Sequence, residues 1–326
     1  MVFPPLLLIL LLSIINPFVY VESKLSLGYY NKTCPDFEKI IRETVTAKQI
    51  SNPTTAAGTL RLFFHDCMVE GCDASVLISS NHAKDTERDA DLNLSLSGDA
   101  FDVIVRAKTA LELSCPGIVS CSDILAQTTR DLIIMVGGPF YKVRLGRKDG
   151  MVSKASLVEG NIPRVNDTVD QMIKLFESNG FTVQEMVALT GAHTIGFSHC
   201  KEFADRLFHF SKTNSTDPDI HPLFAAALKI TCENYTRDHG MSAFNDVMTP
   251  GKFDNMYYKN LKKGLGLLSS DNAMLKDPRT KPIVELYATD QKRFFDAFSH
   301  AMEKLAVHKV KTGRKGEVRR KCDAFN

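Results

Sequence analysis

The chain has 326 residues, with 40 basic and 38 acidic side chains and a formal net charge of +2 at pH 7. This length suffices for one large domain or two packed lobes with a sizeable core. The near balance of charge argues against a nucleic-acid or membrane-surface partner, because both attract strongly basic proteins.

The first 23 residues are predicted to be a secretory signal peptide, and residues 24–326 the mature domain. Residues 4–20 are strongly apolar, but the run is short for a membrane span and is broken by Asn16-Pro17. Small or modest side chains precede Lys24, where a signal peptidase would cut. No Lys or Arg precedes the run, a departure from the usual signal pattern, and a core or anchor helix is the alternative interpretation.

Apolar residues at helical spacing dominate the chain. They predict a helix over residues 37–50 and another over residues 54–64 that reaches His65. Asn52 as N-cap and Pro53 at the first helical position would begin the second helix. Further helices are predicted over residues 101–113, 119–134, 169–176, 186–189, 198–210, 255–263, 280–288 and 291–306.

Few segments alternate as strands do. Two short strands are predicted around Val143 and Met151, and residues 76–100 and 211–254 are expected to be mostly irregular. The sequence therefore predicts a mainly α fold with at most a short β-hairpin.

Local signals mark two helix boundaries. Asn166 or Asp167 is predicted to begin the helix that follows them. Thr182 and Glu185 have the spacing of a capping box, and Gly191 is a favourable residue to end the short helix that they open.

Eight cysteines follow the apolar segment, at positions 34, 67, 72, 115, 121, 200, 232 and 322. An even count in an exported chain indicates four disulfides, although spacing alone leaves about a hundred connectivities. No C-x-x-C pair is present, which argues against a zinc or thioredoxin-type site. Five glycosylation sequons, at Asn31, Asn93, Asn166, Asn214 and Asn234, agree with secretion.

The thirteen residues from Arg61 to Asp73 carry the densest chemistry. Arg61 and His65 lie four apart, so a helix presents both on one side. A permanent cation beside an imidazole lowers its pKa and favours the neutral ring, which can accept a proton. Phe63 and Phe64 would keep the pair dry. The alternative is an ordinary helix end with a solvent-facing Arg and a core His.

A second histidine completes the pattern. His193 lies in the stretch Phe181-Thr-Val-Gln-Glu-Met-Val-Ala-Leu-Thr-Gly-Ala-His-Thr-Ile-Gly196. Alone, a His after a helix is usually structural, its charge favoured by the helix dipole. With the Arg/His helix, the export signal and eight cysteines, it resembles the secretory plant peroxidases, haem enzymes exported to the cell wall and vacuole. The resemblance extends from Leu27 to Cys322.

The resemblance implies two helical lobes that sandwich one haem b. His193 matches the iron ligand, and Asp271 the carboxylate bonded to its other ring nitrogen. His65 matches the proton acceptor and donor in the cleavage of hydrogen peroxide, and Arg61 the group that stabilises the developing charge. Asn93 matches the amide that orients His65, which would leave its sequon unused. Electrons would come from phenolic donors.

The resemblance also implies two calcium ions, each beside one histidine. Oxygen ligands in compact loops suit this hard cation, although the spacing is not that of an EF-hand and a solvated acidic turn is the alternative for the first site. The first ion would be bound by Asp66, Val69, Gly71, Asp73 and Ser75, with Glu87 reaching it through water. The second would be bound by Thr194, Asp246, Thr249, the Lys252 carbonyl and Asp254.

The disulfide pairs that the resemblance implies are Cys34–Cys115, Cys67–Cys72, Cys121–Cys322 and Cys200–Cys232. Pro163 matches the family's donor-contact proline. Asp91, Asn166 and Glu202 stand where some members carry the Phe residues of the donor channel, so the preferred donor stays open.

We expect the protein in the extracellular space or cell wall, because only four residues follow Cys322 and leave no room for a vacuolar extension. We also expect a monomer. The basic tail from Lys309 to Lys321 would either contact cell-wall polysaccharide weakly or be a solvated run of charge. Two rival functions are a haem or calcium protein without turnover and a secreted Cys or Ser hydrolase. The filled catalytic positions oppose the first, and the missing G-x-S-x-G motif opposes the second.

Overall fold

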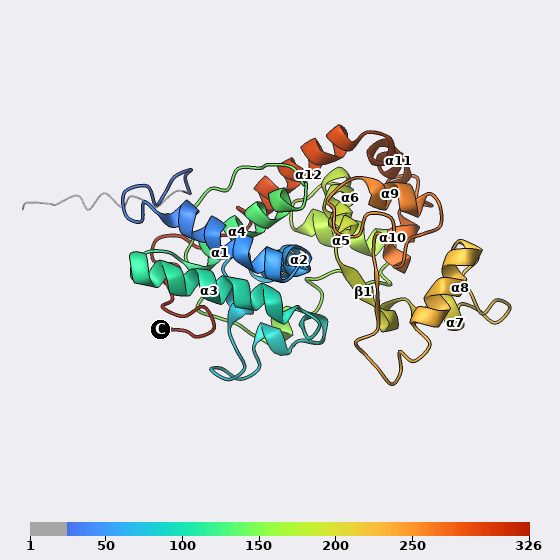
Figure 1. The fold of residues 1–326 in the computed structure, drawn as a ribbon, viewed down its shortest axis with the longest axis horizontal. Helices are drawn as coiled ribbons and strands as arrows, with labels where there is room; N and C mark the ends of the chain where they lie inside the picture. The colour runs from blue at the N-terminus through green and yellow to red at the C-terminus, as the bar shows by residue number, and fades with distance from the viewer. Residues whose placement is uncertain (1–24) are drawn as a thin grey trace, which may run out of the picture.

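The computed structural model describes residues 25–326 (Figure 1), so the predicted signal peptide, residues 1–23, lies outside the described residues. Within this range the chain forms twelve α-helices and one antiparallel pair of three-residue strands, which confirms a mainly α fold. The helices are α1 Phe37–Ser51, α2 Thr55–Val69, α3 Gly98–Ser114, α4 Cys121–Met135, α5 Val169–Ser178, α6 Val183–Thr190, α7 Ala204–Phe208, α8 Pro222–Thr231, α9 Met256–Leu261, α10 Ser269–Ala273, α11 Lys281–Thr289 and α12 Gln291–Leu305. The strands are β1 Phe197–His199 and β2 Ser242–Phe244.

The helices form two main groups, visible on opposite sides of Figure 1. Helices α1 to α4 pack against one another, and α5, α6, α9, α11 and α12 form the second group. One large hydrophobic cluster runs through both groups, and a smaller one lies under α7 and α8. Helix α12 is an example of how apolar spacing produces a packed helix. Its residues Phe294, Phe298 and Met302 recur every four positions and are all buried.

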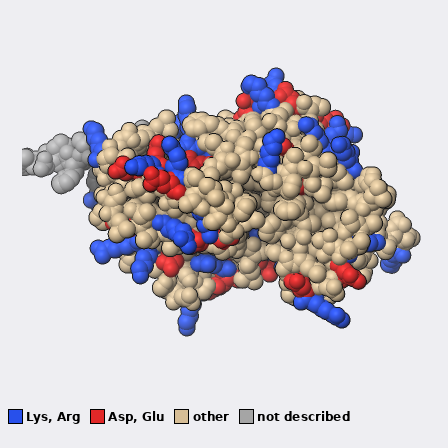
Figure 2. Space-filling view, viewed as in Figure 1, with Lys and Arg blue, Asp and Glu red and all other residues tan. Residues whose placement is uncertain are grey.

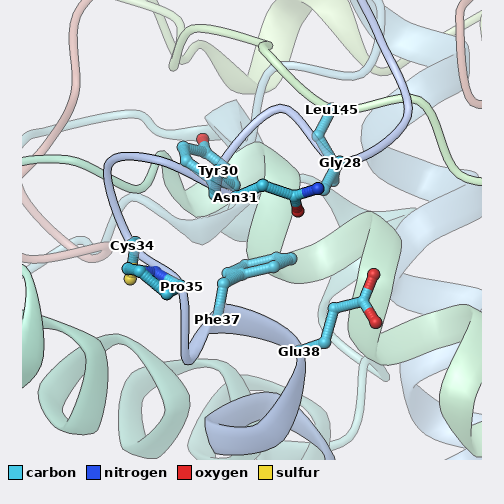
Figure 3. A pocket seen from close by; sticks show the side chains of 8 residues that line it. All are labelled: Gly28, Tyr30, Asn31, Cys34, Pro35, Phe37, Glu38 and Leu145. Atoms are coloured by element: carbon cyan, nitrogen blue, oxygen red, sulfur yellow. The ribbon is translucent and has the colours of Figure 1, made fainter.

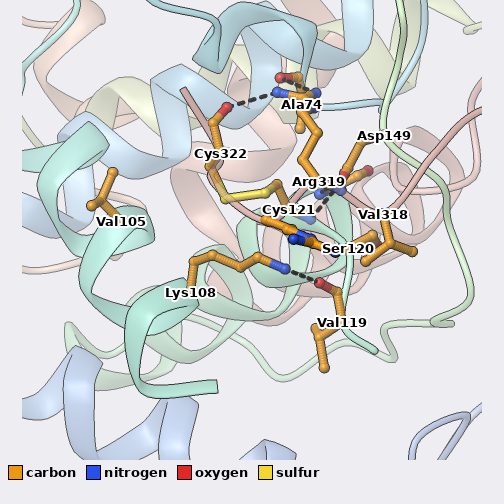
Figure 4. Close-up of a disulfide and its surroundings, with 12 residues drawn as sticks. Ala74, Val105, Lys108, Val119, Ser120, Cys121, Asp149, Val318, Arg319 and Cys322 are labelled. Carbon is orange, nitrogen blue, oxygen red and sulfur yellow. Dashed lines mark hydrogen bonds between the residues drawn. A yellow bond between two sulfur atoms is a disulfide. The ribbon is translucent and has the colours of Figure 1, made fainter. Parts of the chain in front are cut away.

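The C-terminal tail returns to the first group of helices (Figure 4). The Cys121–Cys322 disulfide joins residues 201 apart in the sequence, and the buried Arg319 donates from Nη1 to Cys322 O over 2.7 Å and from Nη2 to Ala74 O over 2.8 Å. The other disulfides are Cys34–Cys115, Cys67–Cys72 and Cys200–Cys232, so the four pairs are the ones that the resemblance implies.

The surface carries both signs of charge. Lys and Arg side chains are interspersed with Asp and Glu on the face shown in Figure 2, in keeping with a net charge of +2. None of the helices within residues 25–326 combines the length and the apolar character that a membrane span requires.

The start and end predicted for the histidine-bearing helix were wrong. Asn52 ends α1, its N–H bonded to Lys48 O over 2.8 Å, and α2 follows Thr54 rather than Asn52. The helix also continues past His65 to Val69. Cys67, Met68 and Val69 are buried in the core, and this burial stabilises the additional helical turn.

Other elements differ from the predictions because tertiary partners or caps decided them. The segments around Val143 and Met151 form isolated bridges with the N-terminal arm and the tail instead of strands. Helix α5 begins after Thr168, which forms a capping box with Gln171, and not after Asn166 or Asp167. The segment 198–210 is a strand, a 3-10 turn and the short α7, and α8 and β2 lie in the segment expected to be irregular.

The capping box of Thr182 and Glu185 is present, with Glu185 N donating to Thr182 Oγ1 over 3.2 Å. Gly191 follows the last residue of α6 as predicted, but it does not end the helical turns. It has φ −58° and begins a 3-10 turn, η5 Gly191–Thr194. It is needed for close packing rather than for a left-handed turn: a Cβ there would lie 2.3 Å from Tyr258 Oη.

Candidate active site

Helix α2 places His65 in a buried position with 5% of its surface exposed. Its Nδ1 donates to Asn93 Oδ1 over 2.6 Å, because the amide oxygen can only accept. Asn93 Nδ2 in turn donates to Glu87 O over 2.8 Å. The amide is thus engaged at both ends and fixes the ring so that Nε2 is the nitrogen available to accept a proton.

The turn that carries Asn93 also holds Arg61. The guanidinium donates from Nη1 to Ser95 O over 2.9 Å, and from Nη2 to Ser95 Oγ over 3.0 Å and Leu92 O over 3.2 Å. Burial and the nearby Arg61 charge lower the pKa of His65 to about 3. The ring is therefore neutral at physiological pH, as the spacing of the pair predicts.

His193 lies on the 3-10 turn η5, which follows α6. Its Nδ1 donates to the carboxylate of Asp271, 3.2 Å from Oδ1 and 3.1 Å from Oδ2. Burial opposes a charged ring here, but the charge and hydrogen bond of Asp271 outweigh it and raise the pKa of His193. The edge of Tyr257 packs on the ring, with centroids 6.0 Å apart.

The two halves of the site approach each other. The Arg61 charge acts on both histidines and disfavours the charged form of each ring, although Asp271 leaves the pKa of His193 raised overall. A Cβ on Gly196, three residues after His193, would lie 2.9 Å from Ala57 Cβ on α2. Arg61 is exposed, and the His193 side chain is 37% exposed although Asp271 beside it is buried. Arg61 is therefore near enough to act on both rings, and the three groups form one candidate site.

The donor set of this candidate site fits a haem. An imidazole whose Nδ1–H is bonded to a carboxylate, with Nε2 directed elsewhere, is the usual arrangement of an axial iron ligand. His193 has this arrangement, with Asp271 as the carboxylate. His65 has an amide partner and a strongly lowered pKa, which suits a base rather than a ligand.

The residues expected at the first calcium site form a buried cluster after α2. Asp66 Oδ1, Ser75 Oγ and both carboxylate oxygens of Glu87 are buried without a hydrogen-bond donor. Burial and the neighbouring Asp73 raise the pKa of Asp66 to about 8, and burial and Asp66 raise the pKa of Glu87 to about 9. Charged carboxylates that are buried without donors are unstable unless a cation compensates them, and a calcium ion would do so.

The backbone of this cluster is shaped to turn sharply. Gly71 has φ +99°, and a Cβ there would lie 2.5 Å from Lys309 O. Val69 is the last residue of α2, and the Cys67–Cys72 disulfide closes the turn.

The residues expected at the second calcium site also lie together. Thr249 Oγ1 donates to Asp246 Oδ2 over 2.9 Å and lies 3.2 Å from Asp254 Oδ1, and Thr194 Oγ1 lies 3.5 Å from Lys252 O. Residues 25–326 hold no cluster of three or more His, Cys, Asp or Glu side chains arranged to bind one metal. Both expected sites instead combine carboxylates with hydroxyl and carbonyl oxygens, ligands that suit calcium.

Pro163 lies in the loop that precedes α5. Ser270 N donates to Val165 O over 3.0 Å, which ties this loop to the helix of Asp271. On the other side, the charge of half-buried Glu202 acts on Arg61. Asp91 and Asn166 are exposed.

A cavity of about 270 Å³ lies elsewhere, beside the N-terminal arm (Figure 3). Its lining contains none of the residues expected at the active site. It consists of Gly28, Tyr30, Asn31, Cys34, Pro35, Phe37, Glu38 and Leu145.

Two residues of the site were missed by the sequence analysis. Ser95 holds Arg61 through its hydroxyl and carbonyl, and Tyr257 packs on His193. Neither has a local signal: Ser95 lies in a polar turn and Tyr257 in an ordinary helical segment.

Comparison with known proteins gives one family. The peroxidase family model matches residues 41–290. Peroxidase 65 of Arabidopsis thaliana is 61% identical over 325 residues, which cover 99% of this chain and 96% of the relative. Peroxidase 41 and Peroxidase 6 of the same plant are each 62% identical, over 93% and 94% of this chain and 91% and 94% of their own lengths.

Proposed function

Because the chain belongs to the secretory plant peroxidases, haem enzymes that reduce hydrogen peroxide with electrons from donor substrates, we propose that it oxidises phenolic donors one electron at a time. The observation that carries the proposal is the pairing of His65 with Asn93 and of His193 with Asp271 around one Arg61. One peroxide would become two waters as two donors each lose an electron and a proton.

We propose that His193 would hold one haem b, which would supply the redox-active iron for peroxide reduction and donor oxidation. Asp271 keeps the His193 ring oriented and increases its basicity. His65 Nε2 takes the proton from the near oxygen of peroxide and returns it to the far oxygen, so that water leaves. Arg61 stabilises the negative charge that develops as the O–O bond breaks.

Proton transfer of this kind contributes about 10²–10⁴-fold in rate, or roughly 3–5 kcal/mol. The lowered pKa of His65 supports the role, because a ring that is already protonated cannot accept a proton.

We propose two calcium ions at the two oxygen clusters, each holding the backbone of one histidine. Asp66 directly follows His65, and Thr194 directly follows His193. Prolonged treatment with EDTA should therefore loosen both histidines, change the haem spectrum and lower activity. An unchanged spectrum and activity after proven loss of calcium would contradict this coupling.

The donor is proposed to meet the protein at the rim near Pro163. The Asp91 charge acts on Arg164, which directly follows Pro163 and is paired with Glu159. The Glu202 charge acts on Arg61 at the site itself. Phenols with a cationic or hydrogen-bonding group should gain from such a rim. Comparing kcat/KM for a neutral phenol and its ammonium-bearing analogue tests this preference.

Plant peroxidases of this class are typically secreted. We propose that residues 1–23 are a signal peptide and that residues 24–326 act as a monomer in the extracellular space or cell wall. Mass spectrometry of the mature N-terminus of the secreted protein tests the cleavage site.

The visible spectrum of the purified protein, before and after one equivalent of peroxide, tests the function together with guaiacol oxidation. A Soret band that changes with peroxide, followed by guaiacol turnover, is the expected result. Absence of a Soret band in protein supplied with haem would contradict the haem site. A normal Soret band without turnover would instead favour the non-catalytic alternative.

A further inference from the structure

The C-terminal tail brings a lysine onto the first calcium cluster. Lys311 Nζ forms an ion pair with Asp73 Oδ2 and lies 3.5 Å from Glu70 O. The Asp73 side chain is 1% exposed, and the Lys311 side chain 25%. The ammonium thus reaches a buried carboxylate from the surface side of the cluster.

The position of Lys311 is set by the backbone around it. Lys148 N donates to Lys311 O over 2.8 Å, in an isolated antiparallel bridge. Further along the tail, Arg319 Nη2 donates to Asp73 O over 3.1 Å, and Arg319 N donates to Asp149 Oδ2 over 2.9 Å (Figure 4). The tail is therefore fixed in register on the turn, and the lysine is directed at Asp73 by that register.

Lys311 and the expected ion would use different oxygens. Asp73 Oδ2 faces the ammonium, while Asp73 Oδ1 accepts from Ser75 N over 3.0 Å. The oxygens without a donor lie on Asp66, Ser75 and Glu87. The ammonium therefore leaves the oxygens that need a cation free to bind one.

The charge balance of the cluster indicates what Lys311 does there. The cluster buries three carboxylates, on Asp66, Asp73 and Glu87. The Arg319 charge also acts here, but it is shared with buried Asp149. One divalent ion and one ammonium would balance the three carboxylates, whereas an unbalanced buried charge is costly. The ammonium and the ion would also repel each other across one carboxylate.

We propose that Lys311 is a built-in counter-cation of the first calcium site, which weakens calcium binding there and stabilises the turn after the ion is lost. The proposal rests on the calcium site proposed above. It assigns Lys311 a positioning role, because it acts on the site through Asp73.

The test compares the wild type with Lys311→Met, Lys311→Arg and, as matched control, Lys315→Met on the same tail, where Lys315 is exposed. Calorimetric titration of calcium into stripped, haem-loaded protein measures affinity, and melting with and without calcium measures stability. Lys311→Met should bind calcium roughly tenfold more tightly at one of two sites and show a larger calcium-dependent gain in Tm. Lys311→Arg and Lys315→Met should behave as the wild type.

Equal isotherms and equal gains in Tm for Lys311→Met and wild type would overturn the role of Lys311. A weaker isotherm for Lys311→Met would overturn it as well. Wild type that binds calcium at neither site would refute the calcium site itself. Guaiacol turnover of the wild type, measured separately, reports on the peroxidase function, so the failures are distinguishable.

Discussion

The two histidines of the active site occupy contrasting surroundings. His65 is nearly fully buried and bonded to a neutral amide, whereas the His193 side chain is 37% exposed and bonded to a buried carboxylate. Burial and Arg61 lower the pKa of His65 to about 3, while Asp271 raises the pKa of His193. The two rings thus differ in their partner: the Asn93 amide leaves His65 neutral and able to take a proton, whereas the Asp271 carboxylate makes His193 more basic.

The two oxygen clusters beside these histidines differ as well. At the first cluster, beside His65 and here called distal, oxygens of Asp66, Ser75 and Glu87 have no donor. At the second cluster, beside His193 and here called proximal, Asp246 already accepts from Thr249 and from Asn260 Nδ2 over 2.7 Å. Protein groups satisfy more of the proximal oxygens, so the distal side should depend more on calcium.

Replacing the distal histidine should have the largest effect. His65→Ala should slow the reaction with peroxide by about 10²–10⁴-fold while the haem absorbance is retained, because only the proton acceptor is lost. Stopped-flow mixing with peroxide measures the rate. His82→Ala, an exposed histidine paired with Asp323, is the control and should react normally. An unchanged rate for His65→Ala would refute its role as base.

Removing the proximal carboxylate should have the next largest effect. Asp271→Asn should lower activity by about 10–100-fold and raise the reduction potential of the iron, because His193 loses its charged partner. Spectroelectrochemistry and guaiacol oxidation provide the two readouts. Asp296→Asn, which removes an exposed ion pair with Lys292, is the control. A lower rate without a change in potential would indicate a merely structural role.

Replacing the amide partner of His65 by a carboxylate, as His193 has, should change the pH dependence of the reaction with peroxide. A carboxylate in Asn93→Asp favours the charged His65 ring and so raises its pKa above about 3. Because only the neutral ring accepts a proton, the acid limb of the peroxide rate should move upward by about 1–3 pH units. Rates from pH 3 to 8 measure the limb; an unmoved limb would show that the partner does not set the proton affinity.

Changes at the N-caps of the helices that position the two histidines should have the smallest effect, and the effect should differ between the two helices. Thr182 caps α6 through a hydrogen bond from Glu185 N, whereas Thr54 before α2 makes no side-chain cap bond. Thr182→Ala should lower the free energy of unfolding by about 1 kcal/mol, and Thr54→Ala by clearly less. Denaturant unfolding of both variants checks the difference; equal losses would contradict the contrast between the two caps.

Features that depend on neighbours in the sequence were predictable. The four-residue spacing of Arg61 and His65 placed both on one helix face, and the Thr182–Glu185 capping box appears in the structure as predicted. Such contacts form within one turn of helix, so local spacing suffices to predict them. The start predicted for α2 was wrong because Asn52 instead ends α1. The local sequence does not distinguish these two roles of Asn52.

The partners of the histidines were decided by tertiary structure. Asn93 and Asp271 lie 28 and 78 residues from the rings that they orient, and only the resemblance to a family pointed to them. Lys311 lies 238 residues from Asp73, and no local pattern joins them. The sequence by itself determined most of the long helices and that an Arg/His pair shares one face, whereas α8 was not predicted. The packing of distant segments decided which polar group each buried side chain meets, because burial requires a partner but does not specify its place in the chain.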